Sequence, residues 1–176
     1  VSVPKPLGYC KIRYPGTSFT DAVFAEDLGP CITATQWIKS LIESGNDKEI
    51  EGAENQIIEL TRAILRAGVV DTDHSMVNII IPASGRAFRL DFELARRPWV
   101  RRLMWKEEGE MIGRLVATYV FAVQPDMERA RSFAHRLASA TGSSAKVLSV
   151  AAQHVTRILE VQSSRKGINS RLVLGW

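Results

Sequence analysis

An apolar stripe over residues 50–67 is the sequence feature that most limits the possible fold. Its members recur at alternating spacings of three and four: Ile50, Ala53, Ile57, Leu60, Ile64 and Ala67. This period places them on one face of an amphipathic helix, which other elements must cover. Asn46, with Glu49 three residues later, is a helix-start pattern, and Gly68 is a natural stop. The sequence therefore predicts a long helix packed into the core of a domain.

Four more helices follow from the same kind of pattern. Thr33 and Gln36 form a capping-box pair that opens a helix, which Ser44-Gly45 closes. Further helical patterns run from beyond Pro98 to Pro125, and over 127–140 and 145–161. On the helix over 127–140 the periodicity predicts that Phe133 and Leu137 face inward and that three arginines face outward. These arginines are Arg129, Arg131 and Arg136.

Strand signals are short and few. Residues 1–14 hold two prolines, and a third follows at position 15, so we expect this segment to be extended and irregular. Ala22–Ala25 suits a buried strand, and the runs over 78–81 and 86–90 predict a hairpin with a turn over 82–85. With 45% hydrophobic residues and no linker strong enough to divide it, the chain is expected to be one domain. The predicted class is α+β, mostly helical.

Polar residues that suit phosphoryl transfer lie at one end of this hairpin. Asp73 is followed five residues later by Asn78, and the second strand leads to Asp91-Phe92. A carboxylate such as Asp73 can orient or accept the proton of an attacking hydroxyl, whereas an amide and a second carboxylate can bind Mg²⁺ beside the phosphates of ATP. Asp and Asn are also common in ordinary loops. The order of helix, loop, strand, turn and strand is what favours the phosphotransferase interpretation.

The segment Gly-Val-Val-Asp-Thr-Asp-His-Ser-Met-Val-Asn-Ile-Ile-Ile over 68–81 resembles a kinase catalytic loop with its following strand. Residues 89–96, Arg-Leu-Asp-Phe-Glu-Leu-Ala-Arg, resemble the metal-binding motif after it. Together they resemble the bacterial lipopolysaccharide kinase group, the Kdo kinases and core heptose kinases, within the protein-kinase-like superfamily. The resemblance covers about residues 1–97, and the C-terminal helices resemble the family only loosely. It implies a kinase-like large lobe with a short catalytic β-hairpin and remnant strands of the small lobe.

The resemblance also implies roles for single residues. Asp73 would be the catalytic base, Asn78 and Asp91 would be ligands of Mg²⁺, and the hinge Glu26-Asp27-Leu28 would contact ATP. Residues 1–28 would be the remnant of the small lobe and hinge, and residues 29–176 the large helical lobe.

Departures from the family pattern limit what the chain is expected to do alone. Glu93 stands where protein kinases have Gly, which is more similar to small-molecule and glycolipid kinases. No glycine-rich phosphate loop and no strand lysine can be placed before the hinge, so we expect the chain to start after those elements. We expect ATP binding to be weak unless an upstream segment or a second chain completes the site.

Basic residues gather in the second half of the chain. Residues 86–176 carry 16 Lys/Arg and 8 Asp/Glu, whereas residues 1–85 carry 7 and 11. An anionic partner such as a glycolipid or a membrane surface would suit this half, and a solvated helical surface is an equal alternative. Arg96, Arg97 and Arg101 follow the metal motif and are candidates to bind an anionic sugar or phosphate. A basic solvated turn is the alternative for them, and without a recognisable nucleic-acid motif that partner is disfavoured.

The predicted function is transfer of the γ-phosphate of ATP to a sugar hydroxyl, in particular of lipopolysaccharide core. The location is expected to be cytoplasmic, with peripheral contact to the inner membrane left open. Two alternatives remain: a catalytically impaired kinase-like scaffold that binds a partner, and a protein or small-molecule kinase of the same fold. His74 is interpreted as a solvent-facing loop residue, with contact to a phosphate or substrate as the alternative. Cys10 and Cys31 are interpreted as buried free thiols, with one disulfide as the weaker alternative.

Overall fold

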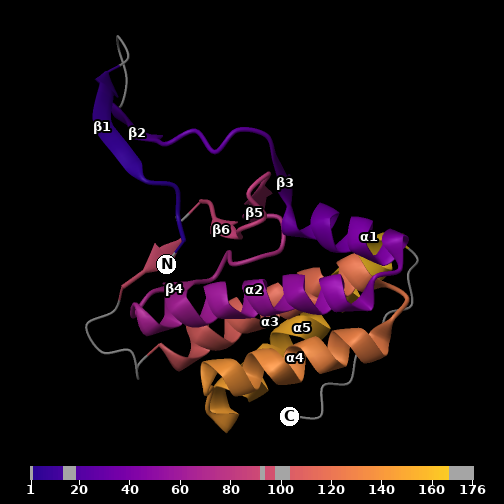
Figure 1. Cartoon of the computed structure of the whole chain (residues 1–176). Helices are drawn as coiled ribbons and strands as arrows, with labels where there is room; N and C mark the ends of the chain where they lie inside the picture. The colour runs from indigo at the N-terminus through magenta and orange to yellow at the C-terminus, as the bar shows by residue number, and fades with distance from the viewer. Residues whose placement is uncertain (1, 14–18, 92–93, 98–103, 167–176) are drawn as a thin grey trace.

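The computed structural model describes residues 2–13, 19–91, 94–97 and 104–166, and their side chains except those of 9–24 and 165–166. These residues form an α+β fold that is mostly helical, which confirms the predicted class (Figure 1). The elements in chain order are β1 (Pro6–Arg13), β2 (Phe19–Ala25), β3 (Cys31–Thr33), α1 (Ala34–Ser44), α2 (Asp47–Arg66), β4 (Val70–Asp71), β5 (Ile79–Pro82), β6 (Phe88–Arg89), β7 (Ala95–Arg96), α3 (Trp105–Val123), α4 (Met127–Thr141) and α5 (Ala145–Lys166).

Helices α1 and α2 begin and end as their capping residues predict. The Thr33 hydroxyl accepts a hydrogen bond from the Gln36 backbone N–H, and the Gln36 side chain accepts one from the Thr33 N–H. Gly45 closes α1 in the left-handed conformation, with φ 69°. The Asn46 side chain accepts from the Glu49 N–H at the start of α2. Gly68, with φ 73°, follows the end of α2 and turns the chain toward the loop.

The hydrophobic core lies between α2, α3 and the helices that pack on them. The predicted stripe of α2 is buried through Ile64, whereas Ala67 is exposed because α2 ends at Arg66 and Ala67 is its C-cap. Helix α3 is the central helix of this body, since α1, α4, α5 and β4 all pack against it. On α3, Ile112, Leu115 and Val116 are fully buried.

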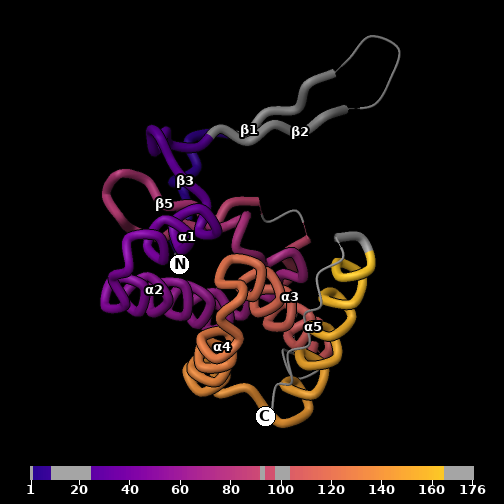
Figure 2. Tube along the Cα trace, turned by 90° about the vertical axis from the view of Figure 1, so that its right-hand side faces the viewer, coloured from indigo at the N-terminus to yellow at the C-terminus, as the bar shows by residue number. Residues whose placement is uncertain are grey.

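Helices α3 and α5 lie side by side (Figure 2), and two glycines on α3 allow their close approach. A Cβ at Gly113 would lie 2.7 Å from the Ala151 carbonyl oxygen, and one at Gly109 would lie 2.8 Å from the Val147 carbonyl oxygen. These are backbone atoms, so α5 as a whole would have to move to make room.

Gly113→Ala is therefore expected to lower the free energy of unfolding by about 1–3 kcal/mol, as overpacking does. This outweighs the roughly 0.5–1 kcal/mol that Ala gains over Gly inside a helix. Urea unfolding measures the effect, and Gly52→Ala on α2 is the matched control, since nothing lies within 4 Å of its added Cβ. Gly52→Ala should stabilise the protein. A Gly113→Ala variant as stable as that control would contradict the close packing of α3 on α5.

The strands form small antiparallel sheets. Strands β1 and β2 pair from Pro6↔Ala25 to Arg13↔Phe19, and in Figure 1 their hairpin extends away from the helices. The expectation that residues 1–14 are irregular is thus wrong for Pro6–Arg13. Pro6 is the first residue of β1, where a missing N–H is tolerated. Strands β3, β5 and β6 form a second sheet with β5 in the middle, and β4 pairs with β7.

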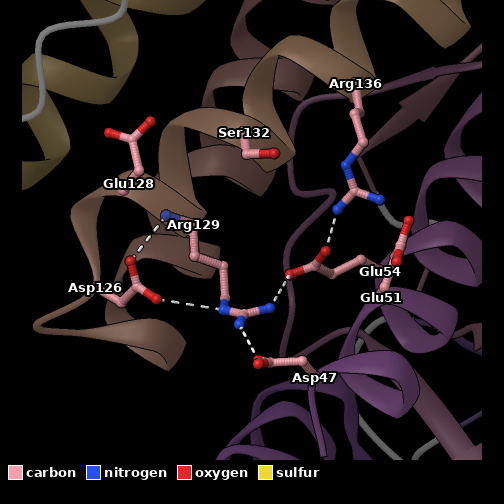
Figure 3. A pocket seen from close by; sticks show the side chains of 8 residues that line it. All are labelled: Asp47, Glu51, Glu54, Asp126, Glu128, Arg129, Ser132 and Arg136. Atoms are coloured by element: carbon pink, nitrogen blue, oxygen red, sulfur yellow. Dashed lines mark hydrogen bonds and ion pairs between the residues drawn. The ribbon is translucent and has the colours of Figure 1, made fainter.

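Two arginines of α4 were wrongly expected to face outward. The Glu54 carboxylate on α2 is buried, and it accepts hydrogen bonds from the Tyr119 hydroxyl and from Arg136. Arg129 Nη1 lies 3.8 Å from the same carboxylate. Figure 3 shows both guanidinium groups directed at Glu54, beside a cavity of about 450 Å³. A buried carboxylate needs such partners, and it draws these two side chains inward, whereas Arg131 pairs with Glu128 on the surface.

The end of α5 and the two cysteines differ in part from what the sequence predicts. Helix α5 is longer than predicted and reaches Lys166. Cys31 is a free thiol but is exposed, because β3 is a three-residue strand at the edge of its sheet. The side chain of Cys10 lies outside the described residues. Among the described helices, none has the length and apolar content needed to cross a membrane.

Candidate functional site

The loop between β4 and β5 is held at both ends by the segment that carries Asp91. On one side, Asp71 pairs with Ala95 in the β4–β7 ladder. On the other, Ile79 pairs with Arg89, and the Leu90 N–H donates to the Asn78 carbonyl at 2.9 Å. The predicted hairpin is confirmed. Since its strands are antiparallel, it brings the backbone of Asn78 and the strand end before Asp91 side by side.

Asp73 and Asn78 are in direct contact inside this loop. Asn78 Nδ2 donates to Asp73 Oδ2 at 2.7 Å and to the Asp73 carbonyl at 3.1 Å. The other carboxylate oxygen of Asp73 lies 3.4 Å from Arg114 Nη1, and the side chain is 34% exposed. The Asp73 carboxylate is thus oriented by the protein and still accessible from solvent.

One face of α3 supports the loop. Met111 Sδ accepts from the Asp71 N–H at 3.4 Å, Arg114 pairs with Asp73, and the Thr118 hydroxyl accepts from the Met76 N–H at 3.1 Å. The three supporting residues are spaced by three and four positions, which puts them on the same side of the helix. The loop therefore rests on the central helix of the domain.

Asp91 is exposed and has an unusual backbone conformation. Its φ is 56°, and within the described ranges no other non-glycine residue is recorded with a positive φ. Asp tolerates this left-handed region better than most residues, and such strain is typical of functional sites. The sequence gives no signal for this conformation beyond the motif itself.

The residues present fit a Mg²⁺ ion that is shared with phosphates. The amide nitrogen of Asn78 is used in its hydrogen bonds to Asp73, so its amide oxygen is the atom that remains a candidate ligand. An amide oxygen and the Asp91 carboxylate are hard ligands, and Mg²⁺ takes one or two such protein groups together with water and substrate phosphates. The described residues contain no group of three or more His, Cys, Asp or Glu able to hold a metal ion.

A buried ion pair beneath the loop is the main feature that the sequence interpretation missed. Arg89 on β6 pairs with Asp71 on β4, and both side chains are 0% exposed. Arg89 also donates to two loop carbonyls, that of Asn78 at 3.1 Å and that of Asp73 at 3.3 Å. The available signal was the position of Arg89, which occupies an inward-facing site on a short strand where an apolar side chain is usual.

His74 is fully buried, so its interpretation as a solvent-facing residue is wrong. Its Nε2 lies 2.9 Å from the Thr61 hydroxyl of α2, and that hydroxyl donates to the Ile57 carbonyl at 2.8 Å. Because the hydroxyl proton is used there, we infer that Nε2 carries the imidazole proton. Burial, and next the positive charge of Arg89, lower the pKa of His74 from 6.5 to about 3. The imidazole is therefore neutral at neutral pH.

Acidification should destabilise the protein through His74. The folded-state pKa lies below 6.5, so the unfolded chain takes up the proton first. The contribution is fully present above pH 6.5 and is lost as pH falls toward 3, at about 1.4 kcal/mol per unit. Between pH 7 and pH 5 the His74→Gln variant should therefore lose about 2 kcal/mol less than the wild type. Urea unfolding at both pH values measures this, and equal losses would contradict the assignment.

The predicted hinge does not take part in the contacts that join Asn78 and the Asp91 segment. The Glu26 N–H donates to the Lys5 carbonyl at 2.9 Å, and Glu26 Oε1 accepts from the Lys5 N–H. Asp27 Oδ1 accepts from the Gly29 N–H at 2.8 Å, and Leu28 is half-buried. The next strand, β3, begins opposite Pro82, at the end of β5 farther from Asn78. Contact of this segment with ATP stays a prediction.

The predicted acceptor-binding arginines are only partly described. Arg96 lies in β7 opposite Val70, and both Arg96 and Arg97 are exposed. Arg101 lies outside the described residues. Since β7 pairs with β4, the strand just before the loop, Arg96 belongs to the same small sheet as Asp71.

Neither a scan against models of protein families nor a search of curated proteins finds a match for this chain.

Proposed function

We propose that this protein is a kinase-like phosphotransferase of the lipopolysaccharide kinase type, which moves the γ-phosphate of ATP to a sugar hydroxyl of lipopolysaccharide core. The observation that carries the proposal is the contact of Asp73 with Asn78, which directly precedes β5, the strand that pairs with the strand leading to Asp91. Phosphoryl transfer requires positioned groups and charge neutralisation more than covalent chemistry. A carboxylate in the loop, an amide just before the hairpin and a second carboxylate just after it would meet that requirement.

Each residue has a separate task in this proposal. Asp73 accepts or orients the proton of the acceptor hydroxyl, while Asn78 and Arg114 fix its carboxylate. Asn78 and Asp91 would hold Mg²⁺, which when bound supplies positive charge beside the phosphates. Arg96 and Arg97 are exposed and would bind an anionic sugar or phosphate of the acceptor. Such an acceptor would bring the protein to the cytoplasmic face of the inner membrane.

Binding of metal-ATP tests the proposal directly. Calorimetric titration with Mg²⁺ and ATP should detect weak binding by the wild type, in line with the incomplete phosphate-binding elements, and Asp91→Asn should weaken it further, by roughly tenfold to a hundredfold, the range for a lost charged contact. Asn keeps the size of Asp and tolerates φ 56°. Glu43→Gln, which changes an exposed acidic residue at the end of α1, is the matched control and should bind like the wild type. Wild-type protein with no detectable affinity for Mg²⁺ and ATP would contradict the proposal.

A catalytically impaired kinase-like scaffold is the second candidate. The observation in its favour is that Asn78 and Arg114 engage both carboxylate oxygens of Asp73, an arrangement that also suits a static loop. A scaffold would show no phosphate transfer with any acceptor. A protein or small-molecule kinase of the same fold would instead label peptides or small alcohols, but not lipopolysaccharide core sugars, from ATP with a labelled γ-phosphate.

A further inference from the structure

One side chain, Arg89, joins the two parts of the candidate site. Its backbone belongs to β6, two residues before Asp91, and pairs with Ile79 of β5. Its guanidinium reaches across to the loop and donates to the Asp71 carboxylate and to the carbonyls of Asp73 and Asn78. A residue two positions before Asp91 is thus bonded to Asp71 at the start of the loop, to Asp73 within it and to Asn78 at its end.

Arginine is suited to this position, since its guanidinium carries five donors in a rigid planar fork and can bond several acceptors at once. A fully buried cation needs a counter-charge, and the Asp71 carboxylate supplies it. The second oxygen of that carboxylate accepts from the Asp73 N–H at 3.0 Å. The ion pair therefore fixes Asp73 through two backbone groups, its N–H and its carbonyl.

We propose that Arg89 is a positioning residue, which sets the Asp73–Asn78 loop against the strand that ends at Asp91, with Asp71 as its buried counter-ion. The support of the loop by Arg89 stands on the structure alone, whereas its effect on catalysis rests on the proposed function. Arg89 lies under the loop and is 0% exposed, so it acts through the residues that it holds. A displacement of about 1 Å at a reacting group can lower a rate on the order of 100-fold, so such a support has kinetic consequences.

Two variants separate positioning from general stability. The double variant Asp71→Leu with Arg89→Met removes both charges at similar volume, a replacement that often leaves stability unchanged. Arg89→Lys keeps a positive charge for Asp71, but its compact ammonium replaces the planar fork. If the double variant does not fold, Arg89→Lys alone is used for the test. Arg86→Met, an exposed arginine three residues earlier, is the control.

Amide hydrogen exchange is the deciding measurement, because it resolves the loop from the rest of the chain. In both variants the amides of residues 73–78 should exchange roughly tenfold to a hundredfold faster than in the wild type, the range for lost charged hydrogen bonds. The amides of α2 and α3 should keep wild-type protection, and the Arg86→Met control should match the wild type throughout. Unchanged exchange of the loop would overturn the proposal. Equal acceleration in the loop and both helices would also overturn it, because Arg89 would then support the whole fold.

Measurements of the phosphate-transfer rate test separately whether the positioning by Arg89 matters for catalysis. If the wild type transfers phosphate from ATP, the same variants should lower kcat at least tenfold, and by a larger factor than they raise the KM for ATP, since positioning acts mainly on the reacting geometry. A wild-type kcat in variants with a loosened loop would overturn the catalytic part of the inference. If the wild type binds no Mg²⁺ and ATP, the proposed function fails, and the exchange data still decide whether Arg89 holds the loop.

Discussion

Arg89→Met is expected to lower the free energy of unfolding by about 3–5 kcal/mol, the range for breaking a buried ion pair by removing one partner. The loss arises because the Asp71 carboxylate would remain charged and 0% exposed with its cation gone. The carbonyls of Asp73 and Asn78 would each lose one of their two donors as well. A loss of this size is a large fraction of the stability of a single domain.

Urea unfolding at pH 7 measures this change, with Arg86→Met as the matched control. Arg86 is exposed, its Nε donates to the Ser2 hydroxyl at 3.0 Å, and its guanidinium lies 5.8 Å from the centre of the Phe88 ring. Its replacement should lower the free energy of unfolding by less than about 1 kcal/mol, as for an exposed cation–π contact. Equal losses of unfolding free energy in Arg89→Met and Arg86→Met would contradict the complete burial of the Asp71–Arg89 pair.

Asp73→Asn is expected to slow phosphate transfer by roughly 10²–10⁴-fold, the usual contribution of a general base. Asn has the size of Asp and keeps an oxygen that can accept from Asn78 Nδ2, so the loop should retain its shape. The affinity for Mg²⁺ and ATP should stay near the wild-type value, because Asp73 is assigned to the acceptor hydroxyl. The effect should therefore fall on kcat.

Transfer from ATP with a labelled γ-phosphate measures the rate, and calorimetry measures the affinity. Asp47→Asn is the control, since Asp47 is an aspartate at the start of α2 that is 83% exposed and pairs with Arg129. It should transfer phosphate at the wild-type rate. A wild-type rate in Asp73→Asn would show that Asp73 is not the base, and the scaffold alternative would stand if neither protein transferred phosphate.

Helix ends and the loop-hairpin order could be predicted because their causes are local. The hydrogen bonds at Thr33 and Asn46 join residues three positions apart, so four consecutive letters are enough to predict them. The β5–β6 hairpin follows from two short runs and the turn between them. For the same reason, the sequence could indicate that Asn78 and Asp91 lie near one another.

The features that the sequence did not predict depend on contacts between distant segments. His74 looks like a loop residue along the chain, and only the packing of the loop on Thr61 buries it. Arg129 and Arg136 follow the polar side of α4, and only the buried Glu54 of α2 explains why they turn inward. The Asp71–Arg89 pair likewise joins residues 18 positions apart. No local pattern specifies which partner a buried charge will find.

Helix α3 contacts α5 on one side and the loop that carries Asp73 on another, and two neighbouring residues make these contacts. Gly113 meets the backbone of α5, while the next residue, Arg114, meets the carboxylate of Asp73. Along α3, the contact with α5 and the contact with the proposed base are therefore one residue apart. Helix α5 lies outside the loop motif, and a displacement of α5 at Gly113 is expected to disturb the Arg114–Asp73 contact as well.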